Sequence, residues 1–411
     1  MTYYDIAMTI HLFNPETDMA LADNNDNYMA PAVICRMAED LAVLPLWYAQ
    51  SGSGVLAPSA YNLEFMERMR QLFSLDVCLV TEPELSGHAD WQLSPWGWNP
   101  SLRKRMQKAG LAEPSLPSVD DLARYRRMAS RANVRLLYAC GDDAGNVSYT
   151  CGGEGILVKA DDFADRENER IATLLSRWQE RGSLCKSLWS GSGKGLYWCR
   201  QGATEKAVDW CRRALRIDGA FWVEPIYNKV EDFAMEFYAD GKGNVRFVGY
   251  SRFVTDGKGA YRGNLLVTDT QVEEWIQQYI PLDAFLCIRE SVREGLSSML
   301  GVGYIGFLGV DMMVCRPEEG HTYTVNPCVE INLRMNMGVV AHTLCNRFVV
   351  PDGKGFFSIE YFPTHEALLK QHVRDVREHP LRVEQGLVVS GYLPLVPVTP
   401  RSRYRAFVRV K

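Results

Sequence analysis

Residues 329–338 read VEINLRMNMG, which places Glu330, Asn332 and Arg334 at every second position between apolar residues. Because successive side chains of a strand point to opposite faces, these three polar groups share one face of a strand whose other face is apolar. A carboxylate, an amide oxygen and a guanidinium together suit a divalent metal ion beside phosphate. A face that only meets solvent does not need this combination, so the stretch predicts a ligand site.

A second stretch, GYIGFLGVDMMV at residues 303–314, is apolar except for Asp311. The turn-rich RPEEGH joins it to YTVNPCVEINLR, and the two predict an antiparallel hairpin in which Asp311 and Glu330 converge. Together with the Asn332 carbonyl, these carboxylates would hold Mg²⁺, which favours few protein ligands; Mn²⁺ is an alternative. Pro327 cannot donate to the ladder, so we expect a bulge or an edge there. A hydrogen-bonded structural role is the alternative for Asp311.

Residues 184–197, LCKSLWSGSGKGLY, place Lys186 at the end of an apolar run, before a glycine-rich loop. Glycine lets backbone amides approach a ligand closely, so this loop can fold over phosphates while Lys186 supplies a mobile charge. A Walker A loop is excluded, because Lys194 is followed by a glycine and the strand-like LYWC. A plain hairpin turn is the structural alternative. The expected nucleotide contacts in the loop are Ser190, Gly191, Ser192, Gly193 and Gly195.

Residues 221–233, FWVEPIYNKVEDF, predict a strand, a break at Pro225 and a second strand, with Glu224 and Asp232 near the two ends. Such a break is typical of a hinge between lobes. A buried adenine needs a backbone donor and acceptor beside apolar walls, and a nearby carboxylate can accept from a ribose hydroxyl. A strand bend with two exposed acids is the structural alternative.

The length, composition and net charge favour an ordinary globular protein with small or neutral partners. A chain of 411 residues with 47% apolar and 23% charged residues predicts two or three domains. The net charge of −5, without a basic tract, predicts neither a nucleic-acid partner nor a membrane surface. The start, MTYYDIAMTIHLFNPE, lacks a basic region before an apolar core, so we expect a cytoplasmic protein. The eleven cysteines form no CxxC pair, and reduced thiols are expected.

The first third alternates strand-like and helix-like runs: TIHLF, PAVICRMAEDLAVL, GVLAP, SAYNLEFMERMRQLF and DVCLVT. This βαβαβ order predicts a parallel, Rossmann-like unit. No GxGxxG follows the first strand, so a nicotinamide cofactor is not expected. Residues 84–118 read as a loop-rich connection, residues 118–131 as a helix with Ser118 as N-cap, and VRLLYAC at residues 134–140 as strand-like.

These elements in this order resemble the ATP-grasp superfamily. The resemblance implies a Rossmann-like domain at residues 1–117, a small ATP-grasp lobe with a glycine-rich lid at 118–222, and a large lobe with antiparallel sheets and a metal site at 223–411. Nucleotide would lie between the two α+β lobes, and a carboxylate would be activated as an acyl phosphate for attack by an amine or another nucleophile.

The same resemblance assigns roles to individual residues. Lys186 would contact phosphate, Glu224 would lie at the adenine hinge, and Arg334 would face phosphate or acyl phosphate. A second basic residue usually precedes the lysine by several tens of residues, and Arg131 and Arg135 are the candidates here. Asp311, Glu330 and Asn332 would hold the metal ion. In TDGKGAYRGN, residues 255–264, Tyr261 and Arg262 could meet an anionic substrate, with a glycine-rich turn as the equal alternative.

The first functional hypothesis is therefore an ATP- and magnesium-dependent carboxylate–amine or carboxylate–thiol ligase with small-molecule substrates. A small-molecule kinase of the same superfamily is the nearest alternative, and a nucleotide-binding protein without turnover is the third. A homodimer is the base-rate expectation for such an enzyme. His342 follows the ExNxR stretch and is expected to be an ordinary helix residue.

Overall fold

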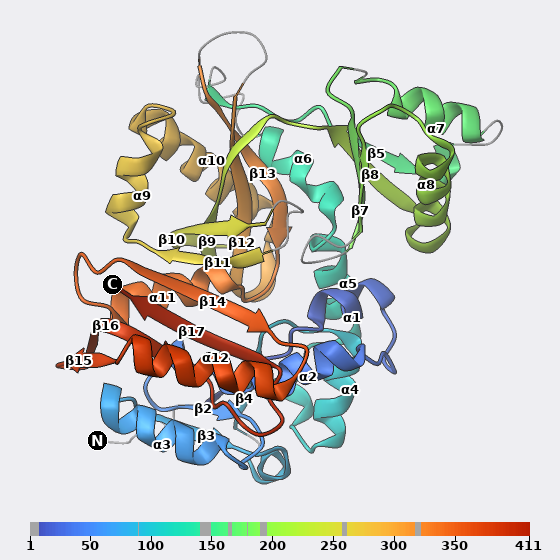
Figure 1. Ribbon diagram of the computed structural model, residues 1–411. Helices are drawn as coiled ribbons and strands as arrows, with labels where there is room; N and C mark the ends of the chain where they lie inside the picture. The colour runs from blue at the N-terminus through green and yellow to red at the C-terminus, as the bar shows by residue number, and fades with distance from the viewer. Residues whose placement is uncertain are drawn as a thin grey trace.

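The computed structural model describes residues 8–88, 90–139, 149–162, 167–178, 180–189, 195–256, 261–316 and 322–411. The strands of these residues form a four-stranded N-terminal sheet, a second four-stranded sheet and a nine-stranded sheet (Figure 1). A parallel N-terminal unit and two antiparallel lobes are the fold class predicted from the sequence, α/β followed by α+β, and that prediction is confirmed.

The N-terminal sheet has the strand order β3-β2-β1-β4, and every pairing in it is parallel. The predicted βαβαβ unit is confirmed, with helices following the first and second strands. The elements are β1 (Thr9–Leu12), α1 (Thr17–Asp23), α2 (Ala32–Asp40), β2 (Ser53–Leu56), α3 (Asn62–Phe73), β3 (Val77–Val80), β4 (Gln92–Pro95) and α4 (Pro100–Lys108).

The prediction of a loop-rich connection at residues 84–118 was wrong in part, because β4 lies within it and pairs with β1. Leu93 is buried while Gln92 and Ser94 are exposed. The apolar–polar alternation that would predict this short edge strand therefore depends on one apolar side chain. Proline, glycine and serine around the strand gave it the composition of a loop.

The strand predicted at VRLLYAC was also wrong, since Val134–Ala139 form the helix α6. Val134 and Leu137 are buried, and Tyr138 adds a partly buried ring next to them. This spacing of three and four residues is helical, and the run was too short for that period to be separated from a strand. The helix predicted before it, α5 (Val119–Met128), is confirmed with a capping box between Ser118 and Asp121.

The small lobe is an antiparallel sheet of order β5-β8-β6-β7. Figure 1 shows its two helices beside the sheet, away from the large lobe. The elements are β5 (Ile156–Lys159), α7 (Glu167–Leu175), β6 (Ser183–Ser187), β7 (Leu196–Cys199), α8 (Glu205–Asp218) and β8 (Ala220–Pro225).

The large sheet has the order β13-β12-β9-β10-β11-β14-β17-β16-β15, and its paired strands are antiparallel. Its strands are β9 (Lys229–Lys242), β10 (Val245–Thr255), β11 (Tyr261–Leu266), β12 (Val302–Cys315), β13 (Thr324–Asn332), β14 (Gly355–Tyr361), β15 (Arg382–Glu384), β16 (Leu387–Pro394) and β17 (Tyr404–Val410). Its helices are α9 (Asp269–Ile276), α10 (Leu282–Leu300), α11 (Met337–Phe348) and α12 (His365–Glu378). Short 3₁₀ helices lie at Leu44–Trp47, Glu82–Gly87, Glu113–Ser115, Arg131–Asn133 and Ala160–Asp162.

The N-terminal unit and the large lobe share one hydrophobic core. Trp47 packs edge-on against Phe348 of α11, with ring centroids 5.3 Å apart. Its indole Nε1 donates to the carbonyl oxygen of Leu395 at 2.7 Å. This packing joins the N-terminal unit to α11 and to the segment that follows β16. Within the described residues, no helix combines the length and apolarity that crossing a bilayer requires.

Candidate functional site

The predicted hairpin exists, and its register brings the two acids together. Asp311 of β12 lies directly opposite Glu330 of β13, and Gly309 lies opposite Asn332. Side chains of directly opposed residues in an antiparallel pair lie on the same face. The register then shifts, so that Met313 pairs with Asn326, and the expected irregularity near Pro327 is confirmed.

The same polar face extends onto β9 and includes Glu236, a residue that was not among the predicted site residues. Glu236 lies opposite Gly309, and Ala234 lies opposite Asp311. Asp311, Glu330, Asn332 and Glu236 therefore share one face across three strands. The signal in the sequence was the alternation in DFAMEF, which puts Asp232 and Glu236 on one side of the strand.

The carboxyl group of Asp311 is hard to ionise without a cation. Burial raises its pKa to about 8, and the neighbouring carboxylates of Glu330 and Glu236 add to the effect, while Asn332 and Arg334 oppose it. A divalent cation would relieve this like-charge repulsion. In the described part of the chain no three His, Cys, Asp or Glu side chains converge to hold a metal ion. Two carboxylates with one amide fit Mg²⁺, which keeps waters and phosphate oxygens as further ligands.

Arg334 extends from the end of β13 to the N-terminal unit. Its Nη2 lies 2.7 Å from the Asp18 carboxylate and its Nε donates to the same group at 2.8 Å. Its Nη2 also donates to Asn332 Oδ1 at 3.0 Å. Asn332 therefore presents its amide oxygen to Arg334, and it would have to turn that oxygen to bind a metal ion.

Arg131 is the upstream basic residue that the structure brings to the site. Its Nη2 donates to Glu330 at 2.8 Å, and its Nη1 donates to the carbonyl oxygen of Ser187 in β6 at 2.9 Å. The side chain is buried. It thus joins the small lobe to the predicted metal ligands, whereas Arg135 is exposed.

Lys186 and Glu224 face one another on adjacent strands of the small lobe. Lys186 Nζ lies 2.6 Å from Glu224 Oε1, and both side chains are buried. Trp222 Nε1 donates to the other oxygen of Glu224 at 2.7 Å, and Lys186 also donates to the carbonyl oxygen of Val329 at 3.4 Å. The lysine expected at phosphate and the acid expected at the hinge are therefore one unit, which touches β13.

The glycine-rich loop falls mostly outside the described residues, which exclude Ser190, Gly191, Ser192 and Gly193. Gly195 is described. It has φ +70°, and its carbonyl oxygen accepts from the amide of Ser187 at 2.9 Å. The predicted flanking strands, β6 and β7, are confirmed as a paired hairpin.

The predicted break in the chain at Pro225 is confirmed, since β8 ends there and β9 starts at Lys229. Asp232 forms an ion pair with Lys229, and Thr255 donates to it at 3.0 Å. Glu224 is buried, so the alternative of two exposed acids at a plain bend is wrong for that residue.

Tyr261 and Arg262 do not act together, because they are adjacent on β11 and point to opposite faces. The Tyr261 hydroxyl donates to Asn264, and burial together with the nearby Glu236 raises the pKa of this phenol. Arg262 is exposed and pairs with Asp256 at 3.0 Å. Only Tyr261 therefore lies on the side of the acidic face.

Glu236 sits in a socket made by glycines and neutral donors. Ser251 Oγ donates to one carboxylate oxygen at 2.8 Å and Asn336 Nδ2 to the other at 2.7 Å. A Cβ at Gly309 would lie 2.7 Å from Glu236 Oε2, and a Cβ at Gly338 would overlap Oε1. Burial raises the pKa of this carboxyl group to about 7.

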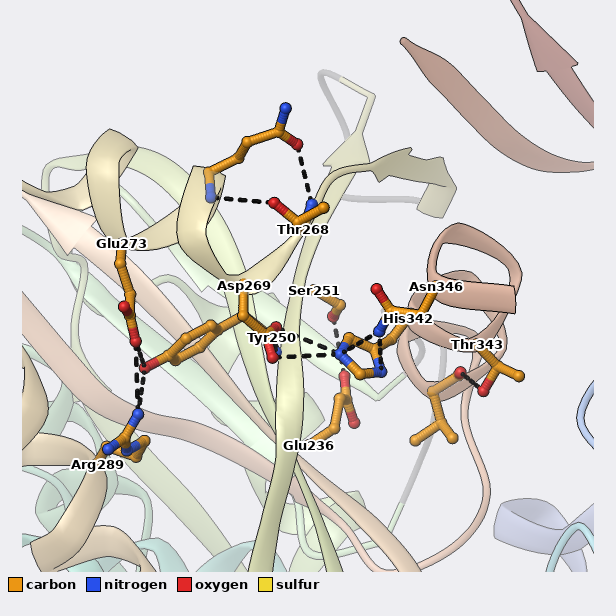
Figure 2. A network of polar contacts seen from close by, with 12 residues as sticks. Glu236, Tyr250, Ser251, Thr268, Asp269, Glu273, Arg289, His342, Thr343 and Asn346 are labelled. Atoms are coloured by element: carbon orange, nitrogen blue, oxygen red, sulfur yellow. Dashed lines mark hydrogen bonds and ion pairs between the residues drawn. The ribbon is translucent and has the colours of Figure 1, made fainter. Parts of the chain in front are cut away.

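His342 lies on α11, as predicted, and Figure 2 shows its ring beside Ser251 and Glu236. Its Nε2 is 3.3 Å from Asp269, and Asn346 lies 3.0 Å from the same nitrogen. The ring occupies the space above Gly249, where no side chain would fit. His342 therefore pairs with Asn346 and with the more exposed Asp269.

The arrangement is the one that the ATP-grasp resemblance implies: a parallel leader, a small lobe with a buried lysine, and a large lobe with an Asp/Glu/Asn face.

Solved structures with a similar chain course include N5-carboxyaminoimidazole synthetase from Staphylococcus aureus, 10% identical with a TM-score of 0.46, over 100% of this chain and 96% of that one. The biotin carboxylase domain of the Hydrogenobacter thermophilus 2-oxoglutarate carboxylase, a dimer with MgADP, ADP and bicarbonate, is 13% identical with a TM-score of 0.49, over 99% and 87%. Biotin carboxylase from Campylobacter jejuni is 10% identical with a TM-score of 0.49, over 98% and 87%. These values are too low to establish a shared activity. No protein-family model and no curated protein matches the sequence.

Proposed function

We propose that the chain is an ATP- and magnesium-dependent ligase that activates a small carboxylate as an acyl phosphate for attack by an amine or another nucleophile. The observation that carries the proposal is the register pairing of Asp311 with Glu330, beside a buried Lys186 that contacts the same strand. A structural ion-pair network does not need two carboxylates directly opposite one another on one face.

In this proposal each group has a defined task. Asp311, Glu330 and Asn332 would hold Mg²⁺, whose charge would offset that of the triphosphate oxygens. Lys186, released from Glu224, would contact phosphate, and Arg131 would stay beside Glu330 to orient that carboxylate. Arg334 would face the transferred phosphoryl group. The protein thereby positions the substrates and neutralises the phosphate charge, and it needs no nucleophilic side chain of its own.

The nucleotide would lie between the lobes. The remaining predicted contacts are Ser190, Gly191, Ser192, Gly193 and Gly195 over the phosphates and Glu224, Pro225 and Asp232 at the adenine and ribose. We propose the boundaries 1–117, 118–222 and 223–411 for the three units; the first unit then includes β4 and α4, and the second ends within β8.

The reaction balances in two steps. A carboxylate oxygen of the acid forms a bond to the γ-phosphorus of ATP, and the bond from that phosphorus to the β–γ bridging oxygen breaks, so ADP leaves with the electron pair. The amine then attacks the acyl carbon, phosphate leaves, and the amine nitrogen loses a proton.

The test incubates the full chain with MgATP, pools of small acids and amino acids, and an amine, and measures ADP and free phosphate separately. One free phosphate per ADP supports the ligase. ADP with a phosphorylated product and no free phosphate would instead identify a kinase. Glu330→Gln serves as the inactive control, since an amide keeps the shape of the side chain but removes the charge that the metal ion requires.

A further inference from the structure

An ion pair between two domains stands at the end of the predicted metal face. Asp18 lies in the first turn of α1, in the N-terminal unit, and Arg334 follows β13 in the large lobe. Nε of Arg334 lies 2.8 and 2.9 Å from the two Asp18 oxygens, and Nη2 lies 2.7 Å from one of them. Both side chains retain some exposure, 33% for Asp18 and 15% for Arg334.

The guanidinium of Arg334 is almost fully engaged in this arrangement. Nε and Nη2 bind Asp18, Nη2 also donates to Asn332, and Nη1 donates to the carbonyl oxygen of Met335 at 3.2 Å. A guanidinium offers only five N–H donors in a fixed planar fork. Arg334 can therefore grip two oxygens of a carboxylate or phosphoryl group only if it releases Asp18.

The pair also marks the point of the parallel sheet where a ligand is expected. The order β3-β2-β1-β4 places β2 and β4 on opposite sides of β1, so the topology switches between β1 and β4. Open parallel sheets bind ligands in the crevice at the carboxyl ends of strands at such a point. Asn14, after β1, donates to the carbonyl oxygen of Gly97, after β4, at 2.8 Å. Met335 donates its amide to Trp96 at 2.8 Å, which brings the large lobe to this edge.

A buried hydroxyl without a partner lies at the same place. Thr17 is 2% exposed, and its Oγ1 has no hydrogen-bond partner among the described residues. A Cβ at Gly97 would lie 2.6 Å from this oxygen and 3.2 Å from Arg334 Cβ, so Thr17 and Arg334 both pack closely against Gly97. An unsatisfied buried hydroxyl is costly, and it points to a polar group that the site receives.

We infer that this edge of the parallel sheet binds an α-amino acid, whose carboxylate would pair with Arg334 and whose ammonium group would pair with Asp18. The inference rests on the proposed ligase function and names the class of its acid. A zwitterion replaces one ion pair by two without changing the charge of the site. The amino-acid carboxylate then lies on the guanidinium that faces the phosphoryl group, which is the position that the activated oxygen requires.

Other substrate classes leave a charge without a partner. An acid that lacks an ammonium group pairs with Arg334 and leaves Asp18 without a cation, since within the described residues Arg334 is the cation that pairs with Asp18. An amine that lacks a carboxylate pairs with Asp18 and leaves Arg334 without an anion. Uncompensated charge in a partly buried site is costly, so the zwitterion is preferred over both.

The experiment compares three mixtures that share the same side chains: the twenty common amino acids, the matching 2-hydroxy acids and the matching amines. In the presence of MgADP, the melting temperature of the full chain should rise with the amino acids and not with the other two mixtures. With MgATP, only the amino acids should stimulate ADP formation. An equal response to the 2-hydroxy acids would overturn the inference.

Variants of Asp18 test the residue itself. Asp18→Asn should raise KM for the amino acid on the order of tenfold or more and abolish the preference over hydroxy acids, while the melting-temperature shift with MgATP remains. Asp18→Glu should restore the preference in part. Asp23→Asn, an exposed acid on the same helix, is the matched control and should behave as the wild type. Unchanged selectivity in Asp18→Asn would contradict the assignment.

The outcomes also separate this inference from the ligase proposal. If other acids yield ADP and phosphate and amino acids do not, the ligase stands and the amino-acid site is wrong. If no acid yields ADP and MgATP does not shift the melting temperature, both proposals are wrong.

Discussion

Lys186 and Glu224 form a buried ion pair across β6 and β8, with Nζ and Oε1 2.6 Å apart and side chains only 4% and 8% exposed. The two opposite charges compensate one another inside the small lobe. Removing one partner leaves an uncompensated buried charge, which typically costs about 3–5 kcal/mol. Removing Lys186 should therefore change both the free energy of unfolding and the binding of nucleotide. These two effects can be measured separately.

Lys186→Met should lower the free energy of unfolding by about 3–5 kcal/mol and abolish the rise in melting temperature with MgATP. The double variant Lys186→Met, Glu224→Gln removes both charges and should recover most of the stability without recovering the MgATP response. Denaturant unfolding and thermal shift provide the two readouts, and Lys206→Ala, at an exposed position on α8, is the control. Retention of the MgATP response in Lys186→Met would show that the lysine does not contact phosphate.

The second prediction concerns the pH dependence that Asp311 imposes on the protein without metal. Its pKa of about 8 in the folded state exceeds the unfolded value of about 4. Between these values the folded state holds a proton that the unfolded state has lost, so the free energy of unfolding should fall as pH rises. Glu236, with a pKa of about 7, adds an effect of the same sign.

Metal binding should reverse this trend, because Mg²⁺ competes with the proton. The rise in melting temperature caused by Mg²⁺ should grow between pH 6 and pH 8. Asp311→Asn should flatten the decline in the metal-free protein and remove the Mg²⁺ response, whereas Asp120→Asn, at an exposed position on α5, should change neither. A Mg²⁺ response that survives in Asp311→Asn would exclude this residue as a ligand.

The β12–β13 hairpin could be predicted because its apolar stretches were long and its polar residues alternated. Asp311 and Glu330 then had to share a face once the strands paired, and the structure pairs them directly. The helix at Val119–Met128 was equally predictable, since Ser118 and Asp121 form a local capping box. Both features depend on residues close in sequence.

The partners that complete the site were not predictable, because they come from distant segments. Asp18 is 316 residues before Arg334, and nothing near either residue indicates their contact. Glu236 lies in a strand whose other acids are half-buried, and its importance appears only when Gly309 and Gly338 make room for its carboxylate. Tertiary packing, which local propensity does not encode, decided both cases.

The third prediction concerns the glycine socket around Glu236. Gly338→Ala would drive a Cβ into the carboxylate and toward Ser251 Oγ. Overpacking of this kind costs about 1–3 kcal/mol, which should exceed the gain that Ala brings to a helix, and the free energy of unfolding should fall. Gly87→Ala, with no atom within 4 Å of its Cβ, is the matched control.

A double-mutant cycle identifies the cause. In the Glu236→Ala background, Gly338→Ala should lower the free energy of unfolding only slightly, because the carboxylate that the new Cβ would overlap is absent. Additive effects of the two changes in denaturant unfolding would show that the socket is not the reason for the glycine.

The last prediction concerns the role of Arg334 in the transfer of the γ-phosphate. If an acyl phosphate forms, then hydroxylamine should trap a hydroxamate when the acid and MgATP are present and the amine is withheld. Arg334→Lys should reduce the hydroxamate yield more than it reduces the MgATP shift in melting temperature, because a lysine cannot grip two oxygens at once and the contact should strengthen as charge moves onto the transferred group. Arg377→Lys, at a side chain that is 77% exposed, should leave the yield unchanged. A stable phosphate ester that resists hydroxylamine, formed with one ADP and no free phosphate, would reject the ligase and identify the chain as a kinase.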